Sequence, residues 1–273
     1  MRITLVSDSP DHPVLGEMVA ALSVRHRVGV LSAQDGDPAA LEGREALHPA
    51  DVYLLKSHTP AALELARRLE RHGAHVVNGW APTLACQDRV LMARRLAEAG
   101  LPSPRTWSLP ALRDAARMLP ALPLPLIVKS RFSRRGDLVA QVHDAAGVEA
   151  LMEAWADEPV ILQEYEDNDG WDVKLWVVGT HAYAARRPSP LRDAPRQTIP
   201  LKGGELSAAW VAATLRVGRE FDLSLYGVDM LTTAHGPVIV DVNAFPGYRG
   251  VPGAGAALAA FAEGLSTRET ATA

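Results

Sequence analysis

Residues 238–248 read V-I-V-D-V-N-A-F-P-G-Y, and the fold is decided by this stretch. Its apolar, β-branched beginning is typical of a strand within a sheet. Side chains alternate between the two faces of a strand, so Asp241 and Asn243 point to one face while the valines beside them point into a core. A proline and a glycine then end the strand. Polar side chains at the end of a buried strand indicate a cluster open to a ligand.

The preceding strand, Y-G-V-D-M-L at 226–231, carries another aspartate. If the two strands form a hairpin centred on His235, Asp229 lies directly opposite Asp241. Facing carboxylates repel each other unless a cation lies between them. Asp229, Asp241 and Asn243 offer the oxygen ligands that suit Mg²⁺, which also binds substrate phosphates. Two alternatives stay open. Asp241 and Asn243 could merely cap a strand before a turn, and separately a one-residue shift would put Asp229 on the far face.

The composition is that of an ordinary globular protein of 273 residues, 48% hydrophobic and 22% charged. Its net charge of −4 argues against non-specific binding to nucleic acid. No apolar run approaches the roughly 20 residues that cross a bilayer, and the first strand meets Asp8 too early for a signal peptide. The single cysteine, Cys86, excludes an internal disulfide. We therefore expect a cytoplasmic protein that binds neither nucleic acid nor membrane.

Strands and helices alternate in the first part of the chain, which predicts a parallel sheet covered by helices. A proline-rich stretch, 102–125, is expected to link it to a mixed, largely antiparallel α+β region with a hairpin that turns near Gly179. The last residues are polar, and we expect them to be disordered. The helices expected from apolar spacing are 13–23, 61–72, 87–99, 145–155 and 207–221.

Further charged residues lie where other strands end. Lys129 ends the strand L-I-V-K-S, where it would bind phosphate as a point charge or lie exposed in solvent. Asp172 and Lys174 are two residues apart on one strand, so they face the same side. The segment Q-E-Y-E, 163–166, leaves a buried strand where its backbone could meet a nucleobase. These positions are consistent with a nucleotide site.

Arginines are concentrated in two segments. The loop S-R-F-S-R-R-G-D, 130–137, would close over an anionic substrate or form a solvated surface turn. The second segment favours recognition of carboxylate or phosphate, although surface arginines are ordinary in this composition. It holds Arg186, Arg187, Arg192 and Arg196. The histidines and the cysteine have no metal-site spacing, and the first βα turn lacks the glycine-rich dinucleotide signature.

The ordered series L-I-V-K-S, I-L-Q-E-Y, W-D-V-K-L-W-V-V-G, Y-G-V-D-M-L and V-I-V-D-V-N-A-F-P-G-Y resembles the ATP-grasp superfamily. The layout resembles RimK-type carboxylate–amine ligases, and R-R-P-S-P-L with F-P-G-Y resembles the inositol trisphosphate 5/6-kinases. The resemblance implies an ATP-grasp fold of mixed α/β and α+β class. Its parts would be an N-terminal α/β domain at 1–88, two α+β subdomains at 89–165 and 166–262 that enclose ATP, and a disordered tail at 263–273.

Carried over to this sequence, the resemblance implies roles for single residues. Lys129 and Lys174 would contact the ATP phosphates, as would Arg89, which stands where many members have a lysine. Glu164 and Tyr165, preceded by Gln163, would meet adenine, and Asp172 would approach ribose. Asp229, Asp241 and Asn243 would bind Mg²⁺, with Mn²⁺ as the alternative ion.

The sequence departs from the family pattern at three points, and these departures, together with the arginines, bear on which substrate the protein takes. Asp241 replaces the glutamate of most ligases, the loop keeps only Gly136 of its usual glycines, and a histidine–glycine pair of the kinases is absent. The anion-binding arginines are expected to act in catalysis. They are Arg131, Arg187 and Arg249, with Arg134 as a further candidate for anion binding.

The first hypothesis is therefore an ATP- and Mg²⁺-dependent carboxylate–amine ligase that works through an acyl phosphate. The second is an ATP-dependent small-molecule kinase with an alcohol acceptor, of the inositol polyphosphate kinase type. A nucleotide sensor without activity is a third, against which the metal ligands argue. We expect an anionic small molecule or peptide as substrate. A homodimer is one possible assembly.

Overall fold

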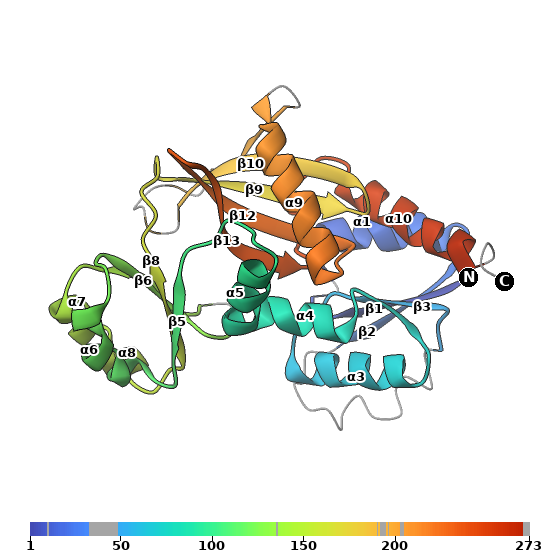
Figure 1. Cartoon of the computed structure of the whole chain (residues 1–273). Helices are drawn as coiled ribbons and strands as arrows, with labels where there is room; N and C mark the ends of the chain where they lie inside the picture. The colour runs from blue at the N-terminus through green and yellow to red at the C-terminus, as the bar shows by residue number, and fades with distance from the viewer. Residues whose placement is uncertain are drawn as a thin grey trace.

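The computed structural model describes residues 1–9, 11–32, 49–134, 136–189, 191, 195, 197–202 and 205–269. These residues form three sheets that follow one another along the chain, and each sheet carries its own helices (Figure 1). The α/β and α+β organisation of an ATP-grasp fold is confirmed. No helix in the described ranges has the length and apolar character that crossing a membrane requires.

The first sheet is parallel and has the strand order β2-β1-β3-β4. Its strands are β1 (Arg2–Ser7), β2 (Arg27–Ser32), β3 (Val52–Leu55) and β4 (His75–Val77). The helices α1 (Pro13–Ser23) and α3 (Pro60–Arg71) lie on opposite faces. Side chains of β1 and β3 alternate between two cores, one against each helix, as the period of a strand requires.

The second, central sheet is antiparallel, with the order β5-β8-β6-β7. Its strands are β5 (Thr106–Leu109), β6 (Leu126–Ser130), β7 (Val139–Val142) and β8 (Val160–Glu164). Short helical segments cover one face: η2 (Leu112–Asp114), α6 (Ala115–Met118), η3 (Leu119–Ala121), α7 (Ala145–Glu149) and α8 (Met152–Trp155). The proline-rich stretch is thus wrongly predicted as a linker, because it contributes β5. An edge strand tolerates flanking prolines, since one side of it needs no hydrogen bonds.

The third sheet is also antiparallel, in the order β11-β10-β9-β12-β13. Its strands are β9 (Trp171–Val178), β10 (His181–Pro188), β11 (Ile199–Pro200), β12 (Leu225–Thr233) and β13 (Gly236–Ala244). The predicted turn at Gly179 is confirmed, and its φ of 61° suits glycine. Helix α9 (Ala208–Phe221) covers one face, and α10 (Ala254–Glu269) covers the other beside α1.

The first and third sheets share one hydrophobic core, whereas the central sheet has a core of its own. Ile3 and Leu5 of β1 pack in one cluster with Trp176 of β9 and Leu258 of α10. Asn78 also joins the two sheets, because its side chain donates to the Leu225 carbonyl at 2.6 Å and accepts from two backbone N–H groups. The central sheet therefore meets the rest of the molecule through polar side chains and the connecting chain.

Three predicted elements differ from the structure in their bounds. The helix expected at 87–99 is α5 (Arg89–Glu98), and an unpredicted helix, α4 (Trp80–Gln87), comes just before it. Extended backbone at Asp88 separates the two helices, and the Asp88 carboxylate caps α5. The apolar side of α5 packs in the core of the third sheet. The helix expected at 145–155 is broken into α7 and α8. The tail was predicted to begin at 263, but α10 continues to Glu269; residues 270–273 lie outside the described part.

The packing of α9 on β12 leads to a prediction about stability. A Cβ at Gly218 would collide with the Tyr226 ring, whereas a Cβ at Gly16 of α1 meets nothing within 4 Å. We expect Gly218→Ala to lower the free energy of unfolding by about 1–3 kcal/mol through overpacking. The matched change Gly16→Ala should raise it by about 0.5–1 kcal/mol through helix propensity. Urea unfolding measures both, and equal effects of the two changes would contradict this account of the core.

Candidate active site

The carboxylates predicted to bind metal face each other across β12 and β13. Met230 pairs with Ile239, so the turn lies half a residue earlier than predicted, and a regular ladder would place Asp229 opposite Val240. A bulge at this point adds one residue to β13 and brings Asp241 opposite Asp229 instead. The predicted pairing is confirmed, but the bulge is what produces it.

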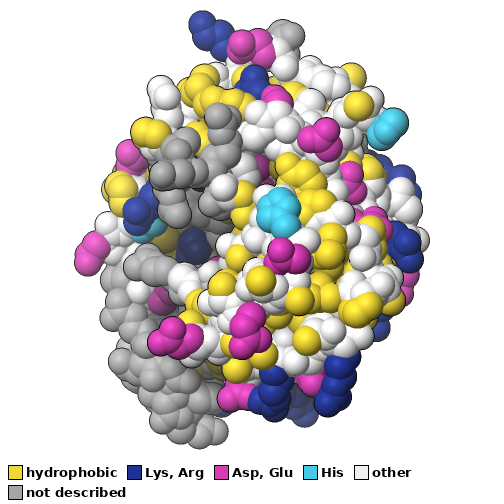
Figure 2. Space-filling model, turned by 90° about the vertical axis from the view of Figure 1, so that its left-hand side faces the viewer, with side chains coloured by type: hydrophobic (Ala, Val, Ile, Leu, Met, Phe, Trp, Pro, Cys, Tyr) yellow, Lys and Arg dark blue, Asp and Glu magenta, His cyan; other side chains and the backbone are white. Residues whose placement is uncertain are grey.

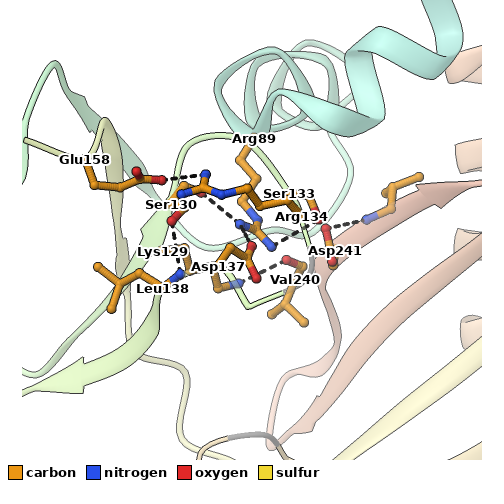
Figure 3. A network of polar contacts seen from close by, with 11 residues as sticks. Arg89, Lys129, Ser130, Ser133, Arg134, Asp137, Leu138, Glu158, Val240 and Asp241 are labelled. Carbon is orange, nitrogen blue, oxygen red and sulfur yellow. Dashed lines mark hydrogen bonds and ion pairs between the residues drawn. The ribbon is translucent and has the colours of Figure 1, made fainter. Parts of the chain in front are cut away.

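The bulge also creates the contact between the central and third sheets. Val240 is omitted from the ladder, and its carbonyl accepts a hydrogen bond from Lys129 Nζ at 3.2 Å. Lys129 lies near the end of β6, so its side chain crosses from one sheet to the other (Figure 3). Burial lowers the pKa of Lys129 to about 8, against the attraction of Asp241. A phosphate group bound next to Lys129 would stabilise the charged form of its ammonium group.

Four charged side chains lie around this point on one face of the third sheet: Lys174, Asp229, Asp172 and Asp241. Lys174 pairs with Asp229 across β9 and β12, with Nζ 2.7 Å from Oδ1 and 2.8 Å from Oδ2. Burial, and then the charge of Asp229, raises the pKa of Asp172 to about 6. The Asp172 Oδ1 atom is buried and has no hydrogen-bond partner among the described residues. Burial also raises the pKa of Asp241.

The donor set fits a divalent cation that is shared with phosphate. Asn243 lies two residues beyond Asp241 and pairs with Gly227, so it shares the face of the two carboxylates. In the described part of the chain, no group of three or more His, Cys, Asp or Glu side chains is placed to hold a metal ion. A metal here would rest on two carboxylates, one amide oxygen and ligand oxygens, which is how Mg²⁺ is commonly held.

A pocket between the central and third sheets adjoins this cluster. Its walls combine apolar side chains with the chain that leaves β8. The face of the molecule drawn in Figure 2 is hollowed, and a basic side chain is visible inside the hollow. Gln163 turns toward Thr106, with Nε2 3.1 Å from Oγ1, and Glu164 lies 3.7 Å from Arg105. The lining includes Ile127, Val139, Leu231, Gln163, Glu164, Tyr165, Lys129 and Asp172. The structure thus brings most predicted nucleotide-binding residues to one pocket.

Arg89 lies apart from that pocket, in a buried network with the 130–137 loop (Figure 3). Its Nη1 donates to the Ser130 carbonyl at 2.8 Å and to Asp137 Oδ2 at 2.6 Å. Its side chain is 7% exposed. The charge of Arg89 nevertheless acts on Asp241 and Lys129. Asp137 therefore holds the guanidinium of Arg89 against the 130–137 loop, and contact of Arg89 with phosphate stays a prediction.

The arginines expected to bind substrate anions contact other side chains of the same protein. Arg131 makes a two-pronged ion pair with Asp88, the cap of α5, at 2.7 Å. Arg187 lies opposite Asp172 in the β9–β10 pair, and its guanidinium stacks on Trp176 and donates to Thr198 at 3.0 Å. Arg187 shares the face of the carboxylates, whereas Arg131 braces the loop.

The two remaining arginines lie far apart in the fold. Arg249 donates from Nε to Nε2 of His12, the N-cap residue of α1, at 2.8 Å. Arg134 pairs with Glu158 at 2.6 Å, which ties the loop to the turn that precedes β8 (Figure 3). Arg192 and Arg196 lie outside the described residues.

Residues with a part in the site were missed in the sequence. The Val240 carbonyl could not be found, because a bulge depends on how two strands pack. Asp137 and Asp88 are carboxylates close to arginine-rich segments, and that charge pattern could have indicated ion pairs. It does not indicate which arginine pairs with which carboxylate.

The raised pKa of Asp172 predicts a pH-dependent stability. An acid whose pKa rises on folding destabilises the folded protein above its unfolded pKa, here increasingly from about pH 4 to about pH 6. Asp172→Asn should therefore raise the free energy of unfolding by about 1–2 kcal/mol at neutral pH, allowing for partial exposure. The gain should shrink at about pH 4.5. Denaturant unfolding at both pH values checks it, with the exposed Asp167→Asn as control; a pH-independent gain would contradict it.

Comparisons with known proteins identify the family of the chain. Residues 86–260 match the family model described as a RimK-like ATP-grasp domain. A probable alpha-L-glutamate ligase 2 of Shewanella sp. (strain MR-4) is 24% identical over 93% of this chain and 91% of its own length. Another from Shewanella frigidimarina is 26% identical over 92% and 91% of the two chains.

Two solved structures have the same fold. The RimK domain protein ATP-grasp from Sphaerobacter thermophilus superposes with a TM-score of 0.76 at 23% identity, covering 96% of this chain and 99% of its own. The D-alanine–D-alanine ligase from Bacillus anthracis, complexed with ATP, has a TM-score of 0.72 at 19% identity, covering 99% and 98%. None of these four proteins is named as a kinase. The chain belongs to the RimK-like ATP-grasp family and is an ATP-dependent carboxylate–amine ligase.

Proposed function

We propose that the ligase transfers the γ-phosphoryl group of ATP to a substrate carboxylate and that an amine then attacks the acyl phosphate. The carboxylate oxygen attacks phosphorus, and ADP leaves. The amine nitrogen then forms a bond to the carbonyl carbon and loses a proton, and phosphate leaves with the former carboxylate oxygen. The observation that carries this proposal is the meeting of Lys129, Lys174, Asp229 and Asp241 beside a pocket with apolar walls.

The residues of this chain would position the nucleotide and neutralise the charge of its phosphate groups. Adenine would occupy the pocket beside Gln163, Glu164 and Tyr165, and Asp172 would reach the ribose. Lys129, freed from the Val240 carbonyl or bridging to it, would bind a phosphate oxygen. Such fixed charges stabilise the transition state of phosphoryl transfer.

The metal and the arginines complete the proposed machinery. Mg²⁺, or Mn²⁺, bound by Asp229, Asp241 and Asn243 would neutralise the phosphate oxygens. Arg187 lies on the same face and would hold the acyl phosphate, with Trp176 fixing its plane. Arg131 and Arg89 would act through the 130–137 loop, whose position their ion pairs set.

L-Glutamate is the first substrate to test, because the relatives described above are named as probable alpha-L-glutamate ligases. The acceptor would be an amino acid or a peptide. Net charge −4 speaks against a nucleic-acid partner. A cytoplasmic location and a homodimer remain part of the proposal.

The fate of the γ-phosphate tests the proposed reaction. We would incubate the protein with γ-labelled ATP, Mg²⁺, L-glutamate and a panel of amino acids and short peptides. Label should be released as free phosphate only when a carboxylate and an amine are both present. Label retained on a small product would instead indicate a kinase. Hydrolysis of ATP in the absence of carboxylate or amine would count against coupling of ATP use to ligation.

The metal ligands predict a further result. Asp241→Asn removes one of two carboxylates and should lower turnover by about 100-fold or more, while ATP binding is partly kept. Asp222→Asn is the matched control, because Asp222 is an exposed carboxylate of the same sheet region in the left-handed conformation that asparagine tolerates. Phosphate release and calorimetric binding of ATP measure the two properties. Full activity of the Asp241 variant would overturn the metal assignment.

A further inference from the structure

A second lysine ends a buried strand, on the first sheet. Lys56 follows β3 in Y-L-L-K-S, much as Lys129 ends β6 in L-I-V-K-S. Leu54 packs in the core shared with the third sheet, and Leu55 in the core against α3. Because side chains alternate along a strand, Lys56 points with Leu54 toward the third sheet. Ligands of parallel α/β sheets bind at this carboxyl edge.

The ammonium group of Lys56 has no hydrogen-bond or ion-pair partner among the described residues. Its side chain is nevertheless largely shielded from water, and burial lowers its pKa, with the charge of Asp8 acting in the opposite direction. A shielded cation without an acceptor is costly. An anion that binds there would remove the cost.

His12 and Arg249 add two more donors to the same place. Arg249 Nε donates to His12 Nε2 at 2.8 Å. His12 is 6% exposed, and burial together with the charges of Arg249 and Lys56 lowers its pKa, so its ring is neutral. Since Nε2 accepts, the proton lies on Nδ1, which is buried without a partner in the described structure. The Lys56 ammonium and the His12 Nδ1–H thus lie near each other, and among the described residues neither has an acceptor.

This donor group lies next to the reaction centre. The backbone at Ala244, directly after the metal ligand Asn243, contacts His58, two residues after Lys56. Gln87 Nε2 holds the same imidazole at 2.9 Å. Arg249 is carried there by the F-P-G-Y turn, in which Tyr248 has a φ of 52° and donates to the Val177 carbonyl at 2.6 Å. The carboxyl edge of the first sheet therefore lies beside the end of β13.

We propose that Lys56, with Arg249 and His12, binds the free carboxylate of the amine substrate. This inference rests on the proposed ligase function. The reacting carboxylate belongs beside Lys129 and the metal ligands, so an anion held at the first sheet is one that does not react. An amino acid that attacks through its nitrogen keeps such a carboxylate. Lys56 would make the enzyme select amino acids or peptide C-termini over simple amines.

The test pairs a change in the protein with a change in the substrate. Lys56→Met, Lys56→Arg and the control Arg71→Met, an exposed charge on α3, are assayed with the accepted amine substrate and with its carboxamide. Lys56→Met should raise the KM of the carboxylate form about tenfold or more, with the KM of ATP changed less than about twofold. It should leave the KM of the carboxamide unchanged, and Lys56→Arg should restore part of the selectivity. A structural role would impair both substrates equally.

Binding measurements separate this inference from the proposed function. The same amino acids and carboxamides are titrated calorimetrically into the wild type and Lys56→Met, each loaded with ADP and Mg²⁺. Absence of turnover with every pair would refute the ligase mechanism, yet a preference for carboxylates that disappears in Lys56→Met would still support the site. An unchanged preference in Lys56→Met, or no preference in the wild type, would overturn the inference. Thermal melting confirms that each variant is folded.

Discussion

The site depends on one hydrogen bond, from the Lys129 ammonium to the Val240 carbonyl. That carbonyl is available because a bulge removes Val240 from the ladder of β13. The same bulge brings Asp241 opposite Asp229 and so builds the acidic pair. One extra residue in a strand thus positions both a cation from the central sheet and the carboxylates of the third sheet. Bulges next to active sites commonly have this effect of redirecting side chains.

The two hydrophobic cores determine what can move around this contact. The first and third sheets share a core that includes Leu5, Trp176 and Leu258, so they form one unit. The central sheet has a separate core, and it meets that unit through Lys129 and the ion pairs of the 130–137 loop. Interfaces of this polar kind favour relative motion of the parts they join. A nucleotide between the sheets would then change contacts without disturbing either core.

The arginines divide into those that organise the protein and those left to bind anions. Arg89, Arg131 and Arg134 each pair with a carboxylate of this chain, so they hold the loop in place. Breaking a buried pair such as Arg89–Asp137 would leave an uncompensated charge, which is strongly destabilising. Arg187 and Arg249 instead contact a hydroxyl group and a neutral imidazole. Neither contact neutralises the guanidinium, so both retain charge for a ligand.

The sequence by itself determined the local elements, the class of the fold and the family of the enzyme. Apolar periodicity placed α1, α3 and α9 to within a residue or two, and the ordered motifs around Lys129 and Asp241 indicated an ATP-grasp ligase. These features depend on neighbouring residues and on motif order. The structure added β5, the break at Asp88 and the bulge at Val240, which depend on contacts between distant segments.

Partner choice among charged groups was decided only by the tertiary structure. Arg131 is predicted to bind substrate and lies on Asp88, whereas Lys56, for which the sequence led to no prediction, has no partner in the described structure. The domain limits and the individual site roles stay predictions. Spacing along a chain shows which face a side chain takes, because the period of a strand or helix is fixed. It does not show which opposite charge the folded chain brings within reach, because that distance is set by the packing of whole sheets.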